Sequence, residues 1–389
     1  MENKEPKLNK MKITGIMLLV AIIIAIIIVY IIYSNNESFR NYADENILKK
    51  NLSDTSLKTI ELDDYDKSTV FAYYKYIAVL KENVLTTYNT SGKKENEQEI
   101  KITTPLITTK GKNVIIAENN SSKAYFITDN NLKWEKEFEG NISRMSVNSN
   151  GYAAIILTGT LYKSVIIVLD EEGNEIFKTY LANTLVEDAA ISEDNRYLSY
   201  AEINTSGTLI QSNIKTIDIN KAKETPNDAV VGNYQAPQNS LAISVKYQNK
   251  TDLICMFDDS ICKIKDGQST KIADIDTKNE KITFYSINLN NVVIKNIEES
   301  TGILNTQTTL KIINTANKKE NTYKFYGVVK ELYSVENKIA LNLGSEVHFV
   351  ANNGWLIKKY NSNQEIIKIV LSNEIAGLVY RNKIEIIKL

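Results

Sequence analysis

Side chains able to do chemistry are scarce in this chain, and its two cysteines are the first to consider. Cys255 and Cys262 stand on either side of the pair Asp258-Asp259. If that pair is the two-residue turn of a β-hairpin, the cysteines become direct cross-strand partners, with Cα atoms about 4.5 to 5.5 Å apart. A disulfide can bridge that separation, and oxidation is permitted outside the cell. Two alternatives stay open: two small apolar strand residues left as thiols, or a structural disulfide between Cys255 and Cys262. Counting from the turn places the cysteines at a hydrogen-bonded pair, where we expect such a bridge to be strained.

Three aspartates close together are the next candidates. Asp63, Asp64 and Asp66 could ligate a hard cation, because carboxylate oxygens suit calcium. The run lacks the glycine and the terminal glutamate of a calcium loop, so a solvated turn is the favoured interpretation. We predict no metal site.

One histidine and two tryptophans complete the set. His348 lies in the alternating segment Glu346–Val350, where a lone histidine is typically a packed or surface residue. Trp134 and Trp355 each follow a turn-forming segment, and we expect them to bury their large rings between structural units. The sequence therefore predicts no catalytic residue and no cofactor-binding residue.

Composition narrows the function classes further. The net charge of −1 leaves no excess of basic charge to hold a polyanion, so nucleic acid is not an expected partner. A single histidine in 389 residues removes His-rich metal sites and confines any Ser-His-Asp arrangement to His348. Two cysteines also exclude a disulfide-dense scaffold.

An uninterrupted apolar run near the N-terminus predicts on which side of a membrane the rest of the chain lies. Residues 13–33 contain no charge and match the roughly 20 residues of a membrane-spanning helix. A signal peptide usually has an apolar core of about 7 to 15 residues and a small-residue cleavage site, so we expect a retained anchor. Four lysines precede the run, at positions 4, 7, 10 and 12. The positive-inside rule then predicts a cytoplasmic tail at 1–12 and an extracytoplasmic remainder.

The chain beyond the anchor changes character twice. Residues 34–56 are polar, with a partial apolar stripe compatible with a short helix, and we interpret them as a stalk. From about Leu57 onward, short runs rich in Ile, Val, Tyr and Thr alternate with clusters of Asn, Asp, Gly, Ser or Lys. That pattern is typical of many short antiparallel strands.

Internal repetition indicates how those strands are organised. Residues 144–157 recur as 188–200, and residues 125–134 recur as 167–177. A period near 40 to 45 residues with about four strands is the spacing of propeller blades. It places units near residues 70, 106, 143, 188, 241, 282, 328 and 366. The polar stretch 221–240 is either a loop or a degenerate strand.

The last unit, residues 366–389, has room for only three strands, and residues 56–62 can supply a fourth. Closing the ring in this way removes exposed sheet edges. We predict an all-β fold, a β-propeller of seven or eight blades at 57–389 with eight favoured, preceded by one transmembrane helix.

Two turn segments carry a family resemblance. The segments Asp129–Trp134 and Asp170–Phe177 are similar to the quinoprotein-like repeat, whose Asp, Gly and Trp positions make a turn and a docking aromatic. Only the second segment has the glycine and only the first has the tryptophan. The whole arrangement resembles an uncharacterised membrane-anchored propeller family of clostridia and related Gram-positive bacteria. This resemblance implies an extracytoplasmic binding or scaffold role and carries over no catalytic residue.

Two functions follow. We expect a binding or scaffold module at the cell envelope, with lipid around the anchor and an envelope protein as partner. The alternative is an extracytoplasmic, glycosidase-like hydrolase that uses two acidic residues. Convergent acidic residues in the central channel would favour the hydrolase, and an apolar or mixed patch on one rim would favour a protein partner.

Overall fold

The computed structural model of the protein describes residues 10–51, 57–207, 210–237, 240–265, 267–276, 278, 280–300 and 306–389. The chain divides into two units, Met1–Ser53 and Asp54–Leu389.

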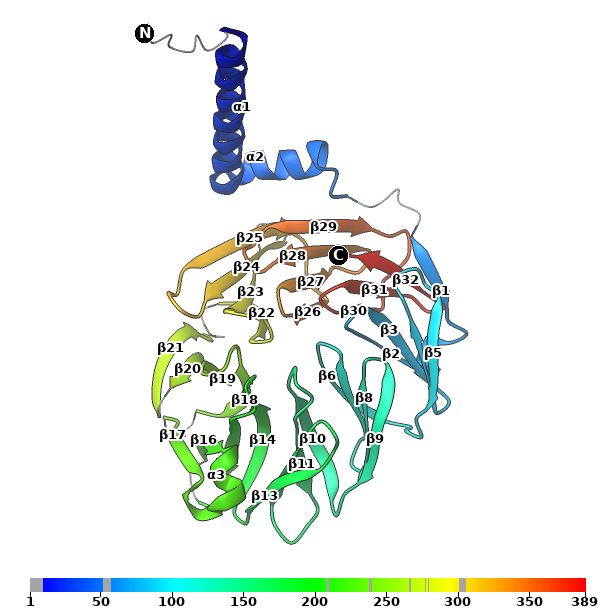
Figure 1. Ribbon diagram of the computed structural model, residues 1–389, viewed down its shortest axis with the longest axis vertical. Coiled ribbons are helices and arrows are strands. Elements are labelled where there is room, and N and C mark those ends of the chain that lie inside the picture. Colours follow the sequence, from blue (N-terminus) through cyan, green and yellow to red (C-terminus); the bar gives the residue numbers. More distant parts are fainter. Residues whose placement is uncertain are drawn as a thin grey trace, which may run out of the picture. The chain divides into compact units, whose positions relative to one another are not determined.

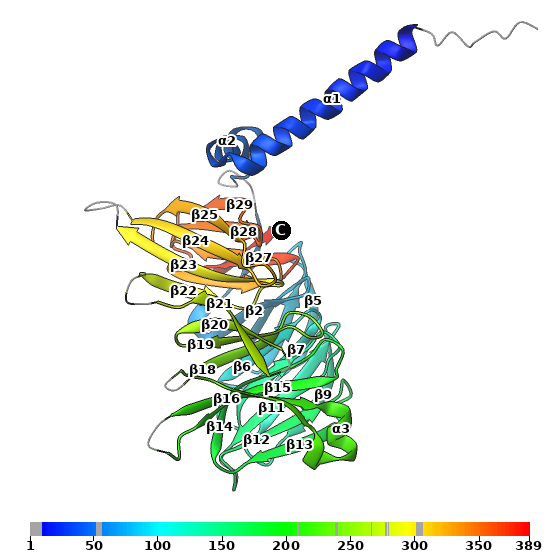
Figure 2. The same cartoon turned by 90° about the vertical axis from the view of Figure 1, so that its left-hand side faces the viewer.

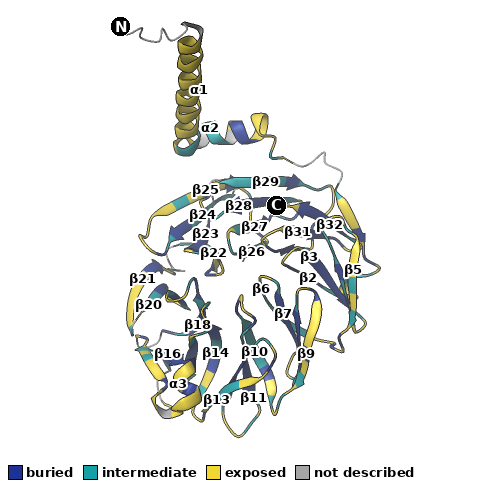
Figure 3. Cartoon of the chain, in the orientation of Figure 1, coloured by how far each residue is buried: buried dark blue, intermediate teal, exposed yellow. Residues whose placement is uncertain are grey.

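The first unit is dominated by helix α1, Lys10–Asn35. Its large apolar residues from Ile13 to Ile32 are exposed, and Figure 3 colours most of the helix as exposed. The part from Lys12 to Asn35 has 24 residues, which corresponds to about 36 Å of helix. Length and composition therefore fit a membrane anchor or a signal sequence.

A second helical segment follows α1 after a break at Asn36. Asn36 has an extended backbone, and its side chain accepts a hydrogen bond from the Phe39 backbone N–H at 2.9 Å, so it caps the new helix. Helix α2, Glu37–Tyr42, continues into a π-helical turn, Ala43–Ile47. The segment runs across the end of α1 and does not prolong it (Figure 1, Figure 2).

The second unit forms eight four-stranded antiparallel sheets within its described residues, arranged in a ring (Figure 1). In seven sheets the strand that comes first in the chain lies toward the centre, whereas in the eighth β1, Lys58–Glu61, is the outermost strand and β30, Lys368–Leu371, is the inner one. Blades 1 to 4 consist of β2 Ser68–Tyr73, β3 Tyr76–Lys81, β4 Val84–Tyr88 and β5 Lys94–Glu99; β6 Pro105–Lys110, β7 Asn113–Glu118, β8 Lys123–Thr128 and β9 Asn131–Glu137; β10 Asn141–Val147, β11 Ala153–Thr158, β12 Ser164–Leu169 and β13 Glu175–Leu181; β14 Thr184–Ile191, β15 Tyr197–Asn204, β16 Gln211–Asp218 and β17 Val230–Gln235.

Blades 5 to 8 consist of β18 Ala242–Tyr247, β19 Leu253–Phe257, β20 Ser260–Lys265 and β21 Gln268–Asp274; β22 Ile282–Ser286, β23 Val292–Ser300, β24 Thr306–Asn314 and β25 Glu320–Tyr326; β26 Glu331–Val335, β27 Lys338–Asn342, β28 Glu346–Ala351 and β29 Leu356–Asn361; β30 Lys368–Leu371, β31 Ile375–Val379, β32 Lys383–Lys388 and β1 Lys58–Glu61. Short helical pieces are α3, Ile219–Glu224, and 3-10 turns at Tyr65–Lys67 and Pro226–Asp228. The prediction of an eight-bladed propeller is confirmed.

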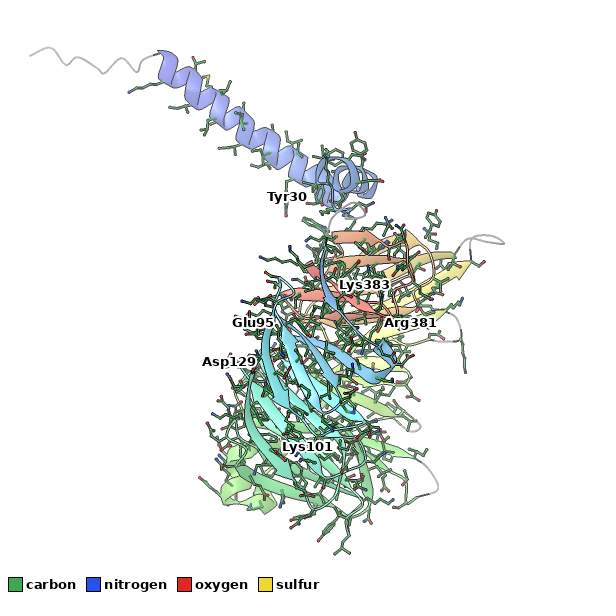
Figure 4. All side chains as sticks on the ribbon, turned by 90° about the vertical axis from the view of Figure 1, so that its right-hand side faces the viewer. Tyr30, Glu95, Lys101, Asp129, Arg381 and Lys383 are labelled. Carbon is green, nitrogen blue, oxygen red and sulfur yellow. The ribbon has the colours of Figure 1, made fainter. Side chains whose placement is uncertain are left out.

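The ring closes as the sequence predicts, within the described part of residues 56–62. Strand β1 pairs antiparallel with β32, the last strand of the chain, in the register Ile60↔Ile384. Figure 4 shows β1 alongside this C-terminal strand, which begins at the labelled Lys383. Ile60 is buried in a cluster with side chains of blade 1 and blade 8, among them Val70 and Ile386. The closing strand therefore packs as well as pairs.

The hydrophobic core lies between neighbouring blades. Each cluster of buried side chains joins two successive sheets: one contains Phe126 and Trp134 of blade 2 with Ile155 and Ile167 of blade 3. Both faces of an inner sheet are covered, which explains why central strands such as Ser164–Leu169 are buried throughout their length. Contacts of this kind hold the blades in a fixed ring.

The open question about residues 221–240 is settled by the structure. Asp218 caps α3 by accepting hydrogen bonds from the backbone N–H groups of Asn220 and Lys221 at 3.1 and 3.2 Å. The 3-10 turn follows, and then β17 completes blade 4 as its outermost strand. The interruption is a short helical insertion before a regular fourth strand.

Candidate functional site

The two cysteines lie where the hairpin argument predicts. Strands β19 and β20 pair in the register Cys255↔Cys262 and Met256↔Ile261, with Asp258 and Asp259 between the strands. Both side chains are buried, in the cluster that joins blades 4 and 5. They are unbonded thiols in this structure, and burial raises the pKa of the Cys255 thiol. The disulfide stays a prediction.

The three clustered aspartates form a solvated turn. Asp63 pairs with Lys81 at 2.6 Å, and this ammonium lowers the pKa of the exposed carboxyl. Asp64 caps the following 3-10 turn by accepting a hydrogen bond from the Asp66 backbone N–H at 3.1 Å. No group of three His, Cys, Asp or Glu side chains that could hold a metal occurs among the described residues.

His348 is a packed residue of β28. Its Nδ1 lies 3.0 Å from the Tyr323 hydroxyl and its Nε2 lies 2.5 Å from a carboxylate oxygen of Glu346. The rings of Tyr323 and Phe325 pack edge-on against it. Burial lowers the pKa of His348, whereas hydrogen bonds from His348 and Lys359 outweigh burial and hold the pKa of Glu346 at about 2. Both ring nitrogens have partners inside the fold, as in an ordinary structural histidine.

Trp134 joins two blades, in agreement with the expectation for its position. Its ring stacks on Phe126 at 5.3 Å between centroids and belongs to the core shared by blades 2 and 3. Gly173, in the turn before β13, lies directly against the indole: a Cβ added there would approach the ring to 2.9 Å, and its φ of +81° also favours glycine. The glycine of one repeat and the tryptophan of the preceding repeat thus form one contact. Trp355 is partly buried just before β29.

A cavity of about 690 Å³ lies where the inner strands of the blades converge, and we call it the central channel. Its lining has mixed charge, with three lysines and two glutamates: Lys110, Lys246, Lys368, Glu336 and Glu374. The lysines keep this lining from becoming the convergent acidic cluster that a hydrolase was expected to show.

Lys246, one of the lysines that line this cavity, has a pKa far below its ordinary value. Its Nζ donates a hydrogen bond to the Asn288 carbonyl oxygen at 2.7 Å. Burial in the channel wall and the nearby Lys110 lower the pKa of Lys246 to about 7, although solvent still reaches part of the side chain. Lys110 itself pairs with Glu193 at 3.3 Å.

The neighbouring strand fixes the position of Lys246. Asp188 of β14 accepts hydrogen bonds from the Ser244 hydroxyl at 2.6 Å and the Val245 backbone N–H at 2.9 Å. These bonds reach β18 where its pairing with β19 shifts register, between Ala242 and Ser244. Asp188 therefore holds the strand next to Lys246. A lysine at an alternating position of an ordinary strand carries no signal of this role in the sequence.

A second cavity, of about 650 Å³, lies between the outer parts of blades 2 and 3, and we call it the blade 2–3 groove. Its apolar lining includes Phe138, Leu157, Val165, Ile167 and Leu169. The last four are almost fully buried and form the floor, because they belong to the core between the two blades.

The loop between β11 and β12 presents apolar side chains at the edge of this groove. Leu161 is fully exposed, and the ring of Tyr162 packs at a tilt against the ring of Tyr180 of β13, with centroids 4.8 Å apart. The Thr160 hydroxyl accepts a hydrogen bond from the Tyr162 backbone N–H at 3.1 Å. Lys163 donates to the Thr205 hydroxyl at 3.0 Å. These contacts fix the loop and leave Leu161 projecting as an apolar knob.

Close packing of backbone against this loop depends on Gly140. A Cβ added at Gly140 would lie 2.7 Å from the Thr160 methyl carbon and 2.9 Å from the Thr158 carbonyl oxygen. Sequence reasoning did not single out this loop, although an apolar pair, Leu161-Tyr162, inside a polar turn is a detectable signal.

Comparisons with known proteins agree with the fold. The sequence matches a family described as a family of unknown function, DUF5711, over residues 47–389. No curated protein matches the chain in sequence.

Among solved structures, the C-terminal WD40 domain of Sif2 has 12% sequence identity and a TM-score of 0.54, covering 85% of this chain and 99% of that one. The WD40 domain of SCAP from fission yeast has 9% identity and a TM-score of 0.52, covering 86% of this chain and 96% of that one. At these identities the likeness concerns the propeller fold alone.

Proposed function

This chain belongs to the DUF5711 family of unknown function, and from that premise we propose that it is a membrane-anchored binding or scaffold module at the cell envelope. Helix α1 is the anchor, the N-terminus is cytoplasmic, and the propeller is extracytoplasmic on a Gram-positive membrane. The apolar length of α1 and the four lysines that precede it support this topology.

The observation that carries the binding role is the exposed apolar knob at the blade 2–3 groove. A leucine with its whole side chain in water, braced by a tyrosine pair on a hydrogen-bonded loop, is arranged as a rigid anchor for a partner. Little ordering of the loop is needed on binding, which leaves more of the contact energy as affinity. The propeller fold, a common platform for protein interactions, supports the same role.

The chemistry of the groove favours a particular kind of partner. Its floor and knob are apolar, and its rim has three carboxylates and two ammonium groups: Glu137, Glu139, Glu175, Lys136 and Lys178. Lys178 already pairs with Glu175 at 2.8 Å. The partner is therefore an envelope protein that brings an apolar segment flanked by basic residues.

Site-specific crosslinking in native membranes tests this role. A photo-crosslinking amino acid at Leu161 should give one discrete adduct, and the same residue at Tyr326, an exposed position on blade 6, should not. The purified partner should then bind wild type at least tenfold more tightly than Leu161→Asp.

Three outcomes would contradict the proposal. These are equal adducts at both positions, an adduct that contains only a second copy of this chain, and partner binding that Leu161→Asp leaves unchanged.

A further inference from the structure

The segment directly after α1 carries exposed apolar side chains that the propeller does not explain. Tyr42, Ile47 and Leu48 are 60%, 63% and 54% exposed. All three belong to α2, the π-helical turn or the residue after it. In a stalk surrounded by water, three large apolar side chains exposed within seven positions would be unfavourable.

A buried ion pair holds this segment against the end of α1. Asp44 is only 3% exposed, accepts a hydrogen bond from the Tyr33 hydroxyl at 2.5 Å and pairs with Lys50 at 2.7 Å. Lys50 also donates to the Tyr33 hydroxyl at 3.0 Å. A carboxylate buried in this way is stable only while its partners stay in place, so the three residues clamp the bend.

The direction of the segment follows from that clamp. Asn36 interrupts α1 and caps α2, which runs across the end of α1 (Figure 1, Figure 2). If α1 spans the bilayer, a segment that crosses its end lies along the membrane surface. Tyr30, near that end of α1 in Figure 4, is an aromatic residue of the type enriched at the membrane interface.

Charge indicates how the segment would bind lipid. Residues 37–50 contain three acidic residues and three basic ones, so their net charge is zero: Glu37, Asp44, Glu45, Arg40, Lys49 and Lys50. Electrostatic attraction to anionic headgroups is therefore not the source of affinity, and insertion of apolar side chains is.

We propose that residues 37–48 form an interfacial foot, with Tyr42, Ile47 and Leu48 inserted at the boundary between headgroups and acyl chains of the outer leaflet. The occupant of this apolar surface is the lipid bilayer itself. The inference rests on the proposed anchoring by α1, and it adds a second, in-plane lipid contact that fixes the bend at the membrane surface.

Depth-dependent fluorescence quenching tests the foot in the full chain. The protein is reconstituted in phosphatidylcholine vesicles with an environment-sensitive dye on one introduced cysteine: Ile47→Cys, Leu19→Cys within α1, or Tyr326→Cys on the propeller. The parent chain, with Cys255 and Cys262 buried, serves as the labelling blank. The dye at position 47 should be quenched by shallow spin-labelled lipid, the dye at 19 by deep spin-labelled lipid, and the dye at 326 by neither.

Quenching at position 47 is also measured at raised salt and in a variant that lacks the clamp. Quenching at position 47 should not change when salt is raised or anionic lipid is added. Asp44→Ala should weaken quenching at 47 and leave quenching at 19 intact, because it releases the clamp and spares the anchor.

Failure of the foot and failure of the anchor are distinguishable. If the dye at position 47 is not quenched while the dye at position 19 is, the interfacial foot is wrong and the membrane anchor stands. Position 19 unquenched overturns the anchoring on which both proposals rest.

Discussion

Lys246 illustrates how a residue's surroundings set its chemistry. Four charged side chains act on its ammonium group. Lys110 disfavours the charged form by repulsion, and the carboxylates of Glu336, Glu193 and Asp188 favour it. Burial outweighs these carboxylates, so the pKa of Lys246 falls from 10.5 to about 7. None of these neighbours is close to Lys246 in sequence, and the perturbation therefore could not be predicted from the chain alone.

The lowered pKa has a definite consequence for stability. The folded protein releases the Lys246 proton near pH 7, whereas the unfolded chain keeps it until about pH 10.5. Between these values the unfolded state binds more protons, so this residue makes the folded state more stable as pH rises. Below pH 7 the full cost of the buried charge is present.

Replacing Lys246 by methionine removes that cost. Lys246→Met should melt at a higher temperature than wild type at about pH 6, and the difference should vanish toward about pH 10. Lys112→Met, at an exposed lysine paired with Asp129, is the control whose offset stays constant between about pH 6 and pH 9. If the melting temperatures of wild type and Lys246→Met differ by the same amount at every pH in this range, the lowered pKa of Lys246 is refuted.

The register of the two cysteines was predictable because it depends only on local counting from a turn. Cys255 and Cys262 are direct partners, and we predict that they are oxidised on the extracytoplasmic side. Alkylation in denaturant followed by intact mass measurement should find no free thiol without reductant and two with it. Two alkylated thiols without reductant would reject the bridge and leave the strand register unaffected.

Strands and turns were largely predictable, whereas loop functions were not. Blade starts near residues 106, 143 and 282 follow from a repeat that each blade imposes on its own sequence. The loop that presents Leu161 depends instead on the contact of Tyr162 with Tyr180 and on the close approach of Thr160 to Gly140, and both partners lie outside the loop. The short helix α3 could not be predicted from the sequence, because six residues are too few to show helical periodicity.

The closing strand β1 gives a direct test at this scale. A chain that begins at Asp64 lacks β1, leaves the edge of β32 unpaired and exposes the cavity left by Ile60 and Leu62. It should lose stability on the order of several kcal/mol, or aggregate. A chain that begins at Asn51 lacks only the membrane helix and foot and should unfold cooperatively as a monomer. Equal urea midpoints for the two chains would contradict the closure.

For the molecule as a whole, the sequence predicted the class of protein better than its site. An apolar run without charge predicts a helix long enough to span a membrane, and a repeat of about 40 to 45 residues predicts propeller blades, so the long apolar helix and the ring could both be anticipated. The groove and the channel are made by residues that meet only when blades pack side by side. Their charges and exposure are therefore properties of the folded ring.

The central claim is that α1 holds the propeller on the outer face of the membrane, and cysteine accessibility in intact protoplasts tests it most directly. Tyr326→Cys should react with a membrane-impermeant maleimide in intact protoplasts, because Tyr326 is 71% exposed on blade 6 and lies outside the blade 2–3 groove. Glu5→Cys should react only after permeabilisation, and the parent chain should stay unlabelled. Labelling of position 5 in intact protoplasts, with position 326 protected, would contradict the account.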